Sequence, residues 1–309
     1  MDAPLGAFTL SQDGRKLFGV CQSVGRGDLM RYDPKIQRFV TYPDPAGLSA
    51  GHVTFSRDGK QAAYVTYPEM NLWKMNADGS GRRMLTDHAA LPQWSPDGRR
   101  VAFMGLQDDN RRPTKIRLVS ADGGAVQEPV GSPEWQGIPT WTVDGNGLIF
   151  GENGDSFPIR ASCAIHRFDF DTGKTSDIPG STGLWTARAC PTGRYISAVT
   201  RDNRKLVLYA ERSAAWTDLA HFADSVIGDN PSWSMDGKFL YFDAPQSADP
   251  AIYRIGISSR RLERVASLKG IQRAGGNMGT WIGLTPDHLP LIVRAAGSDE
   301  IYAWDWIAP

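Results

Sequence analysis

Short runs of alternating apolar and polar residues fill this chain, and tight-turn signals separate them. In residues 92–103, for example, Pro96, Asp97 and Gly98 stand between two apolar runs. Proline pre-sets φ near −65°, aspartate bonds its own backbone, and glycine accepts the left-handed conformation. Alternation with a period of two is typical of half-buried strands. The pattern therefore predicts an antiparallel hairpin at this place.

The same hairpin returns along the whole chain. Successive turn residues lie 39 to 51 positions apart: Asp13, Asp58, Asp97, Asp144, Thr192, Asp236 and Asp287. Third strands are predicted at 72–75, 116–119, 165–168, 252–255 and 301–304, and short fourth strands at 84–86 and 262–265. Four-stranded antiparallel units at this period are typical of propeller blades. The sequence predicts an all-β, seven-bladed β-propeller, with a six-bladed ring as the alternative.

Each innermost strand has one apolar and one polar position before its turn. The residues three before the turn are Leu10, Phe55, Trp94, Trp141, Ala189, Trp233 and Leu284. The residues four before it are Thr9, Thr54, Gln93, Thr140, Arg188, Ser232 and Gly283. Because successive side chains of a strand point to opposite faces, the first set is expected in the blade core and the second on the other face.

The repeat accounts for the whole chain, which predicts a single propeller domain over residues 1–309. The units are expected at 8–42, 52–86, 91–130, 138–179, 186–219, 230–265 and 281–309. The last unit has only three strands, and an unpaired edge invites aggregation. We therefore expect the residues before Phe8 to supply the missing strand and strap the two termini together.

Composition excludes several functions. The 34 basic and 34 acidic residues balance, so no global field attracts nucleic acid. No apolar run approaches the ~20 residues of a membrane helix, and no membrane insertion is expected. Three cysteines without close pairs indicate neither a disulfide framework nor a zinc site, and Cys190 is expected to be a small buried residue. The five histidines lack metal-binding spacing, so neither a metal nor another cofactor is expected.

Enzyme chemistry finds little support in the sequence. We find no Gly-x-Ser-x-Gly nucleophile elbow, and no pair of carboxylates can be assembled from the predicted inner strands. The expectation is therefore a protein without catalytic residues that binds a peptide, a protein or a small ligand.

Propeller ligands usually meet the ring where loops lead into the innermost strands; we call this side the loop face, and the opposite side, with the Asp-Gly turns, the turn face. Candidate ligand-binding residues for the loop face are Arg188, Trp185, Trp135, His52, His88, Gln93, Asp229, Asn230 and Asn277. Arg188 is the only charge at its repeat position, which suits a carboxylate or phosphate. An ion pair is the alternative for Arg188, and packing between blades is the alternative for Trp135 and Trp185.

The Trp-Ser-Pro-Asp-Gly core at residues 94–98 resembles the TolB-like propeller repeat, a bacterial relative of the WD repeat. The C-terminal stretches 281–287, 290–294 and 300–306 resemble the end of bacterial signalling proteins in which a propeller follows a CadC-type winged-helix domain or a Ser/Thr kinase domain. This resemblance implies a non-catalytic sensor domain, extracytoplasmic (periplasmic) in a membrane-anchored protein and otherwise soluble and cytoplasmic. A protein-interaction scaffold and a hydrolase or lyase with its site in the channel are the alternatives.

Overall fold

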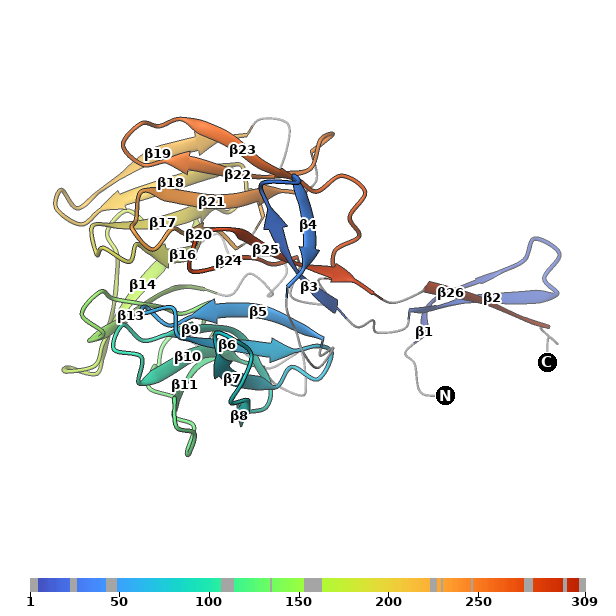
Figure 1. Cartoon of the computed structure of the whole chain (residues 1–309), viewed down its shortest axis with the longest axis horizontal. Coiled ribbons are helices and arrows are strands. Elements are labelled where there is room, and N and C mark those ends of the chain that lie inside the picture. The colour runs from blue at the N-terminus through green and yellow to red at the C-terminus, as the bar shows by residue number, and fades with distance from the viewer. Residues whose placement is uncertain are drawn as a thin grey trace.

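The computed structural model describes residues 5–22, 27–42, 49–106, 114–133, 135–152, 163–222, 227–228, 230–245, 247–274, 280–296 and 299–305. Within these ranges every regular element is a strand, and the strands form antiparallel sheets (Figure 1). The all-β fold class is thus confirmed. None of these residues belongs to an apolar helix long enough to cross a membrane.

Five sheets follow one another in chain order. The first is β5 (Ala50–Phe55), β6 (Gln61–Thr66), β7 (Leu72–Asn76) and β8 (Arg83–Thr86); the second is β9 (Ala89–Trp94), β10 (Arg100–Gly105) and β11 (Lys115–Ser120). The third is β12 (Thr140–Trp141), β13 (Gly147–Gly151), β14 (Ile165–Asp169) and β15 (Lys174–Asp177). The fourth is β16 (Leu184–Ala189), β17 (Tyr195–Thr200), β18 (Lys205–Ala210) and β19 (Ala215–His221); the fifth is β20 (Ser232–Trp233), β21 (Phe239–Ala244), β22 (Ala251–Gly256) and β23 (Leu262–Ser267).

Strands from both ends of the chain build the sixth sheet. β24 (Ile282–Leu284) and β25 (Pro290–Ala295) pair with β3 (Gly27–Asp33) and β4 (Arg38–Thr41). Because β3 and β24 both contact β5, this sheet closes the ring. The expected strap of residues before Phe8 is therefore wrong, since β3 completes the last sheet instead.

The remaining strands form a separate sheet. β1 (Leu5–Leu10) and β2 (Lys16–Gln22) pair with β26 (Asp299–Asp305), and Figure 1 shows these three strands apart from the ring, beside both termini. The predicted unit at 8–42 is thus divided between two sheets. Six sheets form the ring in the described part of the chain, so a count of seven blades is not confirmed.

The turns have one shared construction. In the second sheet, Ser95 Oγ donates to Asp97 Oδ1 at 2.6 Å, the Arg99 amide donates to the same oxygen at 3.0 Å, and Gly98 has φ of 69°. Equivalent hydroxyl–aspartate bonds close the turns at Asp13, Asp58, Asp144, Asp236 and Asp287. His288 occupies the glycine position with φ of 64°, a conformation that costs a residue with a Cβ more than it costs glycine.

Indole N–H groups link neighbouring sheets through main-chain carbonyls. Trp141 Nε1 donates to the Gln93 carbonyl at 3.0 Å, and Trp233 Nε1 donates to the Arg188 carbonyl, also at 3.0 Å. Both tryptophans come from the expected apolar position and are buried. Each therefore satisfies its buried N–H while it fills the space between two sheets. Cys190 is a buried free thiol, which confirms its expected role as a small core residue.

The turn aspartates predict a pH dependence of stability. The Ser234 hydroxyl, together with the Lys238 amide, lowers the pKa of Asp236 to about 2. Because the unfolded value is about 3.9, the stabilisation is complete above pH ~4 and is lost as the pH falls through ~2. We expect Asp236→Asn to lower Tm at pH 6 and the difference from the parent to shrink between pH 4 and pH 2, as measured by thermal unfolding. The exposed Glu69→Gln is the control; a difference that stays constant down to pH 2 would contradict this assignment.

Candidate functional site

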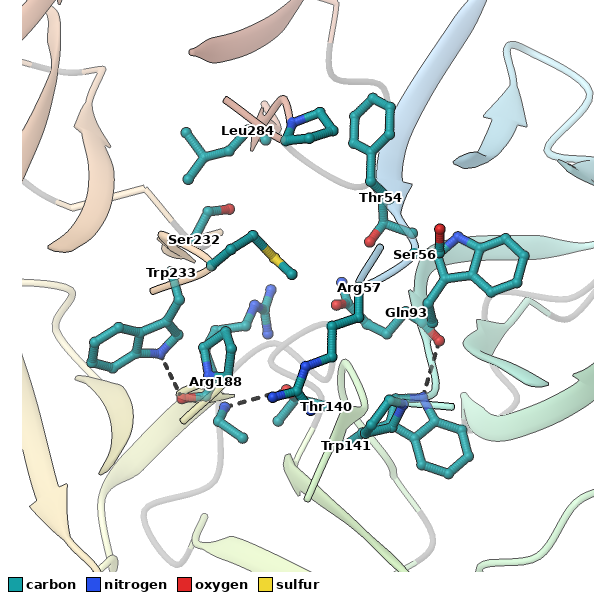
Figure 2. A pocket seen from close by; sticks show the side chains of 18 of the residues that line it. Thr54, Ser56, Arg57, Gln93, Thr140, Trp141, Arg188, Ser232, Trp233 and Leu284 are labelled. Carbon is teal, nitrogen blue, oxygen red and sulfur yellow. Dashed lines mark hydrogen bonds between the residues drawn. The ribbon is translucent and has the colours of Figure 1, made fainter. Parts of the chain in front are cut away.

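One residue from each innermost strand lines the same cavity. We call these residues the collar: Thr54, Gln93, Thr140, Arg188, Ser232 and Gly283. They are the polar position four before the turn, in six of the seven repeats. Figure 2 shows Thr54, Gln93, Thr140, Arg188 and Ser232 around the opening, with Trp141 and Trp233 farther from its centre. The cavity has a volume of about 400 Å³, which lies within the range of small-molecule sites.

The cavity opens towards the turn face. Its wall includes Ser56–Gly59 of the first sheet's turn and the turn prolines Pro96, Pro191 and Pro286. A much smaller cavity of about 20 Å³ lies against the collar and is lined by His52, Leu91, Asn230 and Trp281. Gln93, Arg188 and Ser232 line both cavities. The larger space is therefore reached from the turn side, whereas the sequence favoured the loop face.

Arg188 lies at the floor of the larger cavity. Its side chain donates to the Ala187 carbonyl at 2.9 Å and to Asn230 Oδ1 at 3.2 Å, and the residue is 7 % exposed. These contacts hold the guanidinium in a fixed place between the two cavities. The structure thus brings together four of the expected binding residues, namely Arg188, Gln93, Asn230 and His52.

An inner-strand bulge places His52 at the smaller cavity. His52 has φ of 50°, and the equivalent residues Leu91 and Thr186 have φ of 50° and 53°. At each of these places the pairing register of the inner strand (β5, β9 or β16) with its neighbour shifts. His52 Nδ1 accepts a bond from the Leu91 amide at 3.4 Å. Burial lowers the pKa of His52 to about 4, so its imidazole is neutral at pH 7.

The other expected residues do not gather at the cavities. Trp185 is half-buried, and its Nε1 donates to Asn203 Oδ1 of its own sheet at 2.8 Å. Trp135 is half-buried, and His88 is exposed beside Asp87. Neither lines the two cavities described here. Asp229 and Asn277 lie outside the described residues.

Arg57 is a cavity residue that was not predicted from the sequence. This exposed arginine lines the larger cavity from the turn of the first sheet, and Figure 2 shows its side chain reaching towards Thr140. A signal was available, because the residue before the turn aspartate is Gln12, Pro96, Val143, Pro191, Met235 or Pro286 in the other repeats. Arg57 is the one charge at that position, as Arg188 is at the collar position.

The cavity offers few groups for acid–base chemistry. Among its described lining residues, the only carboxylate is Asp58, which accepts from Ser56 Oγ at 2.6 Å and from the Lys60 amide at 3.0 Å. The only imidazole is His288, whose Nε2 accepts from the Met235 amide at 3.1 Å. Both groups thus bond to their own or a neighbouring turn. Nowhere in the described ranges do three or more His, Cys, Asp or Glu side chains gather as a metal site would require.

Comparison with known proteins identifies relatives among the peptidases. The chain is 27 % identical over 231 residues to the uncharacterized peptidase YuxL of Bacillus subtilis, which covers 68 % of this chain and 32 % of YuxL. A shorter segment of 63 residues is 40 % identical to dipeptidyl-peptidase 5 of Porphyromonas gingivalis, over 17 % of this chain and 9 % of that protein. The chain thus spans about a third of the length of YuxL.

These relatives correct two expectations from the sequence. The expected non-catalytic sensor, and with it the expectation that the protein is no enzyme, is wrong, because the similarity to a named peptidase extends over 68 % of the chain. The alternative of a hydrolase agrees better with this finding. The lack of a nucleophile elbow in these 309 residues led to the expectation of a protein without catalytic residues. The similarity to the peptidases extends over only part of their length.

The fold comparison agrees with the repeat analysis. A TolB-type protein of Agrobacterium tumefaciens superposes with a TM-score of 0.65 at 18 % identity, over 88 % of this chain and 98 % of that structure. The family model of the TolB β-propeller domain matches residues 52–275. Apart from the first two residues of β5, this match covers the first five sheets of the ring to the end of β23, with the collar residues from Thr54 to Ser232. The chain therefore belongs to the TolB β-propeller domain family.

Proposed function

We propose that this chain is the propeller of a peptidase-type hydrolase. The observation that carries the proposal is the 27 % identity to the peptidase YuxL over 68 % of the chain. In this proposal the collar cavity admits and orients peptide, and its volume of about 400 Å³ has room for a few residues of an extended peptide.

The proposal assigns bond cleavage to groups other than those of the cavity. The hydroxyls of Ser56 and Ser95 each donate to a turn aspartate at 2.6 Å, so both are committed to their own turns. Nucleophilic catalysis by serine needs an adjacent base within hydrogen-bond reach. In this proposal the collar is a passage or a binding element, and a separate catalytic unit performs the reaction.

The test is peptide hydrolysis by the natural protein that carries this chain. A panel of aminoacyl and dipeptidyl p-nitroanilides would be assayed at pH 7.5, and we expect turnover of at least one of them. The isolated chain of 309 residues serves as the control and is expected to be inactive. No turnover of the panel or of longer unmodified peptides, followed by mass spectrometry, would reject the proposal.

A further inference from the structure

The collar cavity carries an excess of positive charge. Arg57 and Arg188 are its two cationic side chains, and Asp58 is the only carboxylate in the described lining. Asp58 is already bonded to Ser56 and Lys60, and these hydrogen bonds lower its pKa, so it stays ionised within its own turn. The described lining thus carries one more guanidinium than carboxylates.

Uncommitted donors surround this charge. Within the described part of the chain, neither the Arg57 guanidinium nor the side chains of Gln93 and Ser232 have a hydrogen-bond partner. Four tryptophans, Trp94, Trp141, Trp233 and Trp281, contribute indole rings to the walls. Apolar walls strengthen the attraction between a guanidinium and an anion because they lower the local dielectric constant. Guanidinium groups bind carboxylates through paired N–H donors.

We infer that Arg57 and the collar form a carboxylate subsite, which takes peptides by a free C-terminus or an acidic side chain. This inference rests on the proposed function for its substrate class. Arg57 at the exposed rim captures the anion, and Arg188 with Gln93 and Ser232 meets it at the floor of the cavity.

The test compares two probes on the full chain. Isothermal titration calorimetry would measure the binding of N-acetyl-trialanine with a free carboxylate and of the same peptide as its carboxamide. We expect the acid to bind at least tenfold more tightly at low salt, with the difference shrinking as salt screens the charges. Arg57→Gln is expected to remove most of the difference, and Arg188→Gln to do the same if its melting curve shows a folded protein. Arg99→Gln, an exposed turn arginine outside the cavity, is the matched control.

The outcomes separate the two proposals. Equal binding of the acid and the amide, or an acid preference that survives in Arg57→Gln, overturns the subsite and leaves the peptidase proposal to its own assay. Loss of the preference in Arg99→Gln as well would show a general charge effect and also overturn it.

A separate observation concerns the two strands that join the chain ends. Residues 28–33 in β3 are Asp-Leu-Met-Arg-Tyr-Asp, and residues 300–305 in β26 are Glu-Ile-Tyr-Ala-Trp-Asp. The two segments share an acidic residue, an aliphatic residue, an aromatic residue and a final aspartate at the same positions. They therefore have the same pattern for pairing with a second strand.

The observed registers allow β3 and β26 to change places. β26 now pairs with β2 so that Trp304 lies opposite Leu17, and β3 pairs with β25 so that Leu29 lies opposite Val293. In the same registers, β3 on β2 would place Tyr32 opposite Leu17, and β26 on β25 would place Ile301 opposite Val293. The number of paired strands would not change.

Chain connectivity favours the exchanged pairing. In the five other sheets of the ring, the second and third strands are consecutive neighbours. The links from β2 to β3 and from β25 to β26 have four and three residues, which are hairpin lengths. The free sheet also exposes apolar side chains, with Leu10 52 % and Trp304 38 % exposed, which insertion between two sheets would bury.

We propose that β3 and β26 exchange their pairing partners, which gives the ring a second way to close. After the exchange, β1-β2-β3-β4 form one sheet and β24-β25-β26 form another, and the ring has seven sheets. The exchange breaks the contact of β5 with β3 and β24, because another sheet has to enter the ring at that place. In the seven-sheet ring, Thr9 would take the collar position of its repeat, and the channel would be wider by one sheet.

Two pairs of cysteine substitutions, each combined with Cys21→Ser, distinguish the observed pairing of β3 and β26 from the exchanged pairing. Lys16→Cys with Asp305→Cys reports the observed pairing, because these residues are partners and form an ion pair at 3.3 Å. Lys16→Cys with Asp33→Cys reports the exchanged pairing, and direct antiparallel partners lie within disulfide reach. We expect both pairs to cross-link within purified monomers under mild oxidation, as mapped by mass spectrometry. Lys16→Cys with Arg99→Cys, in a distant turn, measures the background.

Cross-linking of only one of the two pairs would overturn the exchange, and so would an Asp33 cross-link found only between two copies. The positions Phe18, Ala303 and Arg31 provide a second set of variants with the same logic, because Phe18 pairs with Ala303 in the structure and would pair with Arg31 after exchange.

Discussion

Asp243→Ala should lower the free energy of unfolding by about 3–5 kcal/mol. Asp243 in β21 forms an ion pair with Arg273, and the two side chains are 1 % and 6 % exposed. Arg273 also donates to the Trp281 carbonyl at 2.9 Å, so the pair ties the fifth sheet to the start of the sixth. Removing the carboxylate leaves a buried guanidinium without its counter-ion, and this desolvated charge causes the loss.

Urea unfolding followed by tryptophan fluorescence would measure this loss. Asp28→Ala is the matched control, because Asp28 forms an ion pair with Arg294 at 2.7 Å while both side chains are exposed; its cost should be about 0–1 kcal/mol. Asp243→Leu with Arg273→Met removes both charges and should recover much of the loss. If Asp243→Ala cost no more than Asp28→Ala, the ion pair would contribute little to the closure between the two sheets.

Phe242→Ala should cost about 3–5 kcal/mol for a different reason. Phe242 has no exposed surface and packs between the fourth and fifth sheets, with its ring centroid 5.3 Å from that of Phe222 and 6.0 Å from that of Tyr253. Truncation removes buried apolar area and leaves a cavity that rigid sheets cannot fill. Phe242→Leu keeps most of the volume and should cost about 1.5 kcal/mol or less.

The same urea experiment would rank Phe242→Ala, Phe242→Leu and Leu262→Ala, in which Leu262 is an exposed strand residue of the same sheet. We expect a change within about 0.5 kcal/mol for the exposed position. Equal losses for Phe242→Ala and Leu262→Ala would mean that the space between these sheets is loosely packed. Phe242 and Asp243 are adjacent but lie on opposite faces of β21, so their effects have separate physical origins.

The repeat pattern predicts the ring and the collar because both depend on local rules. A Ser-x-Asp-Gly turn and a period-two strand recur along the chain, so the alternation alone assigns Trp141 to the core and Arg188 to the opposite face, which lines the channel. The closure of the ring depends on which of two similar strands, β3 or β26, reaches β25, and this choice is long-range. Local pattern cannot decide it, since both strands carry the same pattern.

The sequence likewise could not show on which side of the collar the larger cavity lies. Whether the free volume lies towards the loops or the turns depends on the size of the side chains around the collar and on three-dimensional packing. The smaller cavity beside His52 and Leu91 has a volume of about 20 Å³, whereas the cavity on the turn side has about 400 Å³. Arg57 is the one charge at its repeat position, but only this geometry shows that it lines the cavity.

The indole bonds that link neighbouring sheets do not depend on the side chains that line the cavity. Trp141 and Trp233 bond the main-chain carbonyls of Gln93 and Arg188 and make no use of the collar side chains in doing so. A collar position can therefore mutate without breaking the link that its own backbone makes to the neighbouring sheet. Evolution, or a designed library restricted to the collar positions, can vary the lining of the cavity while the indole bonds stay in place. The exceptions are collar side chains that themselves link two sheets, Arg188 through Asn230 and Thr140 through the Ala189 amide.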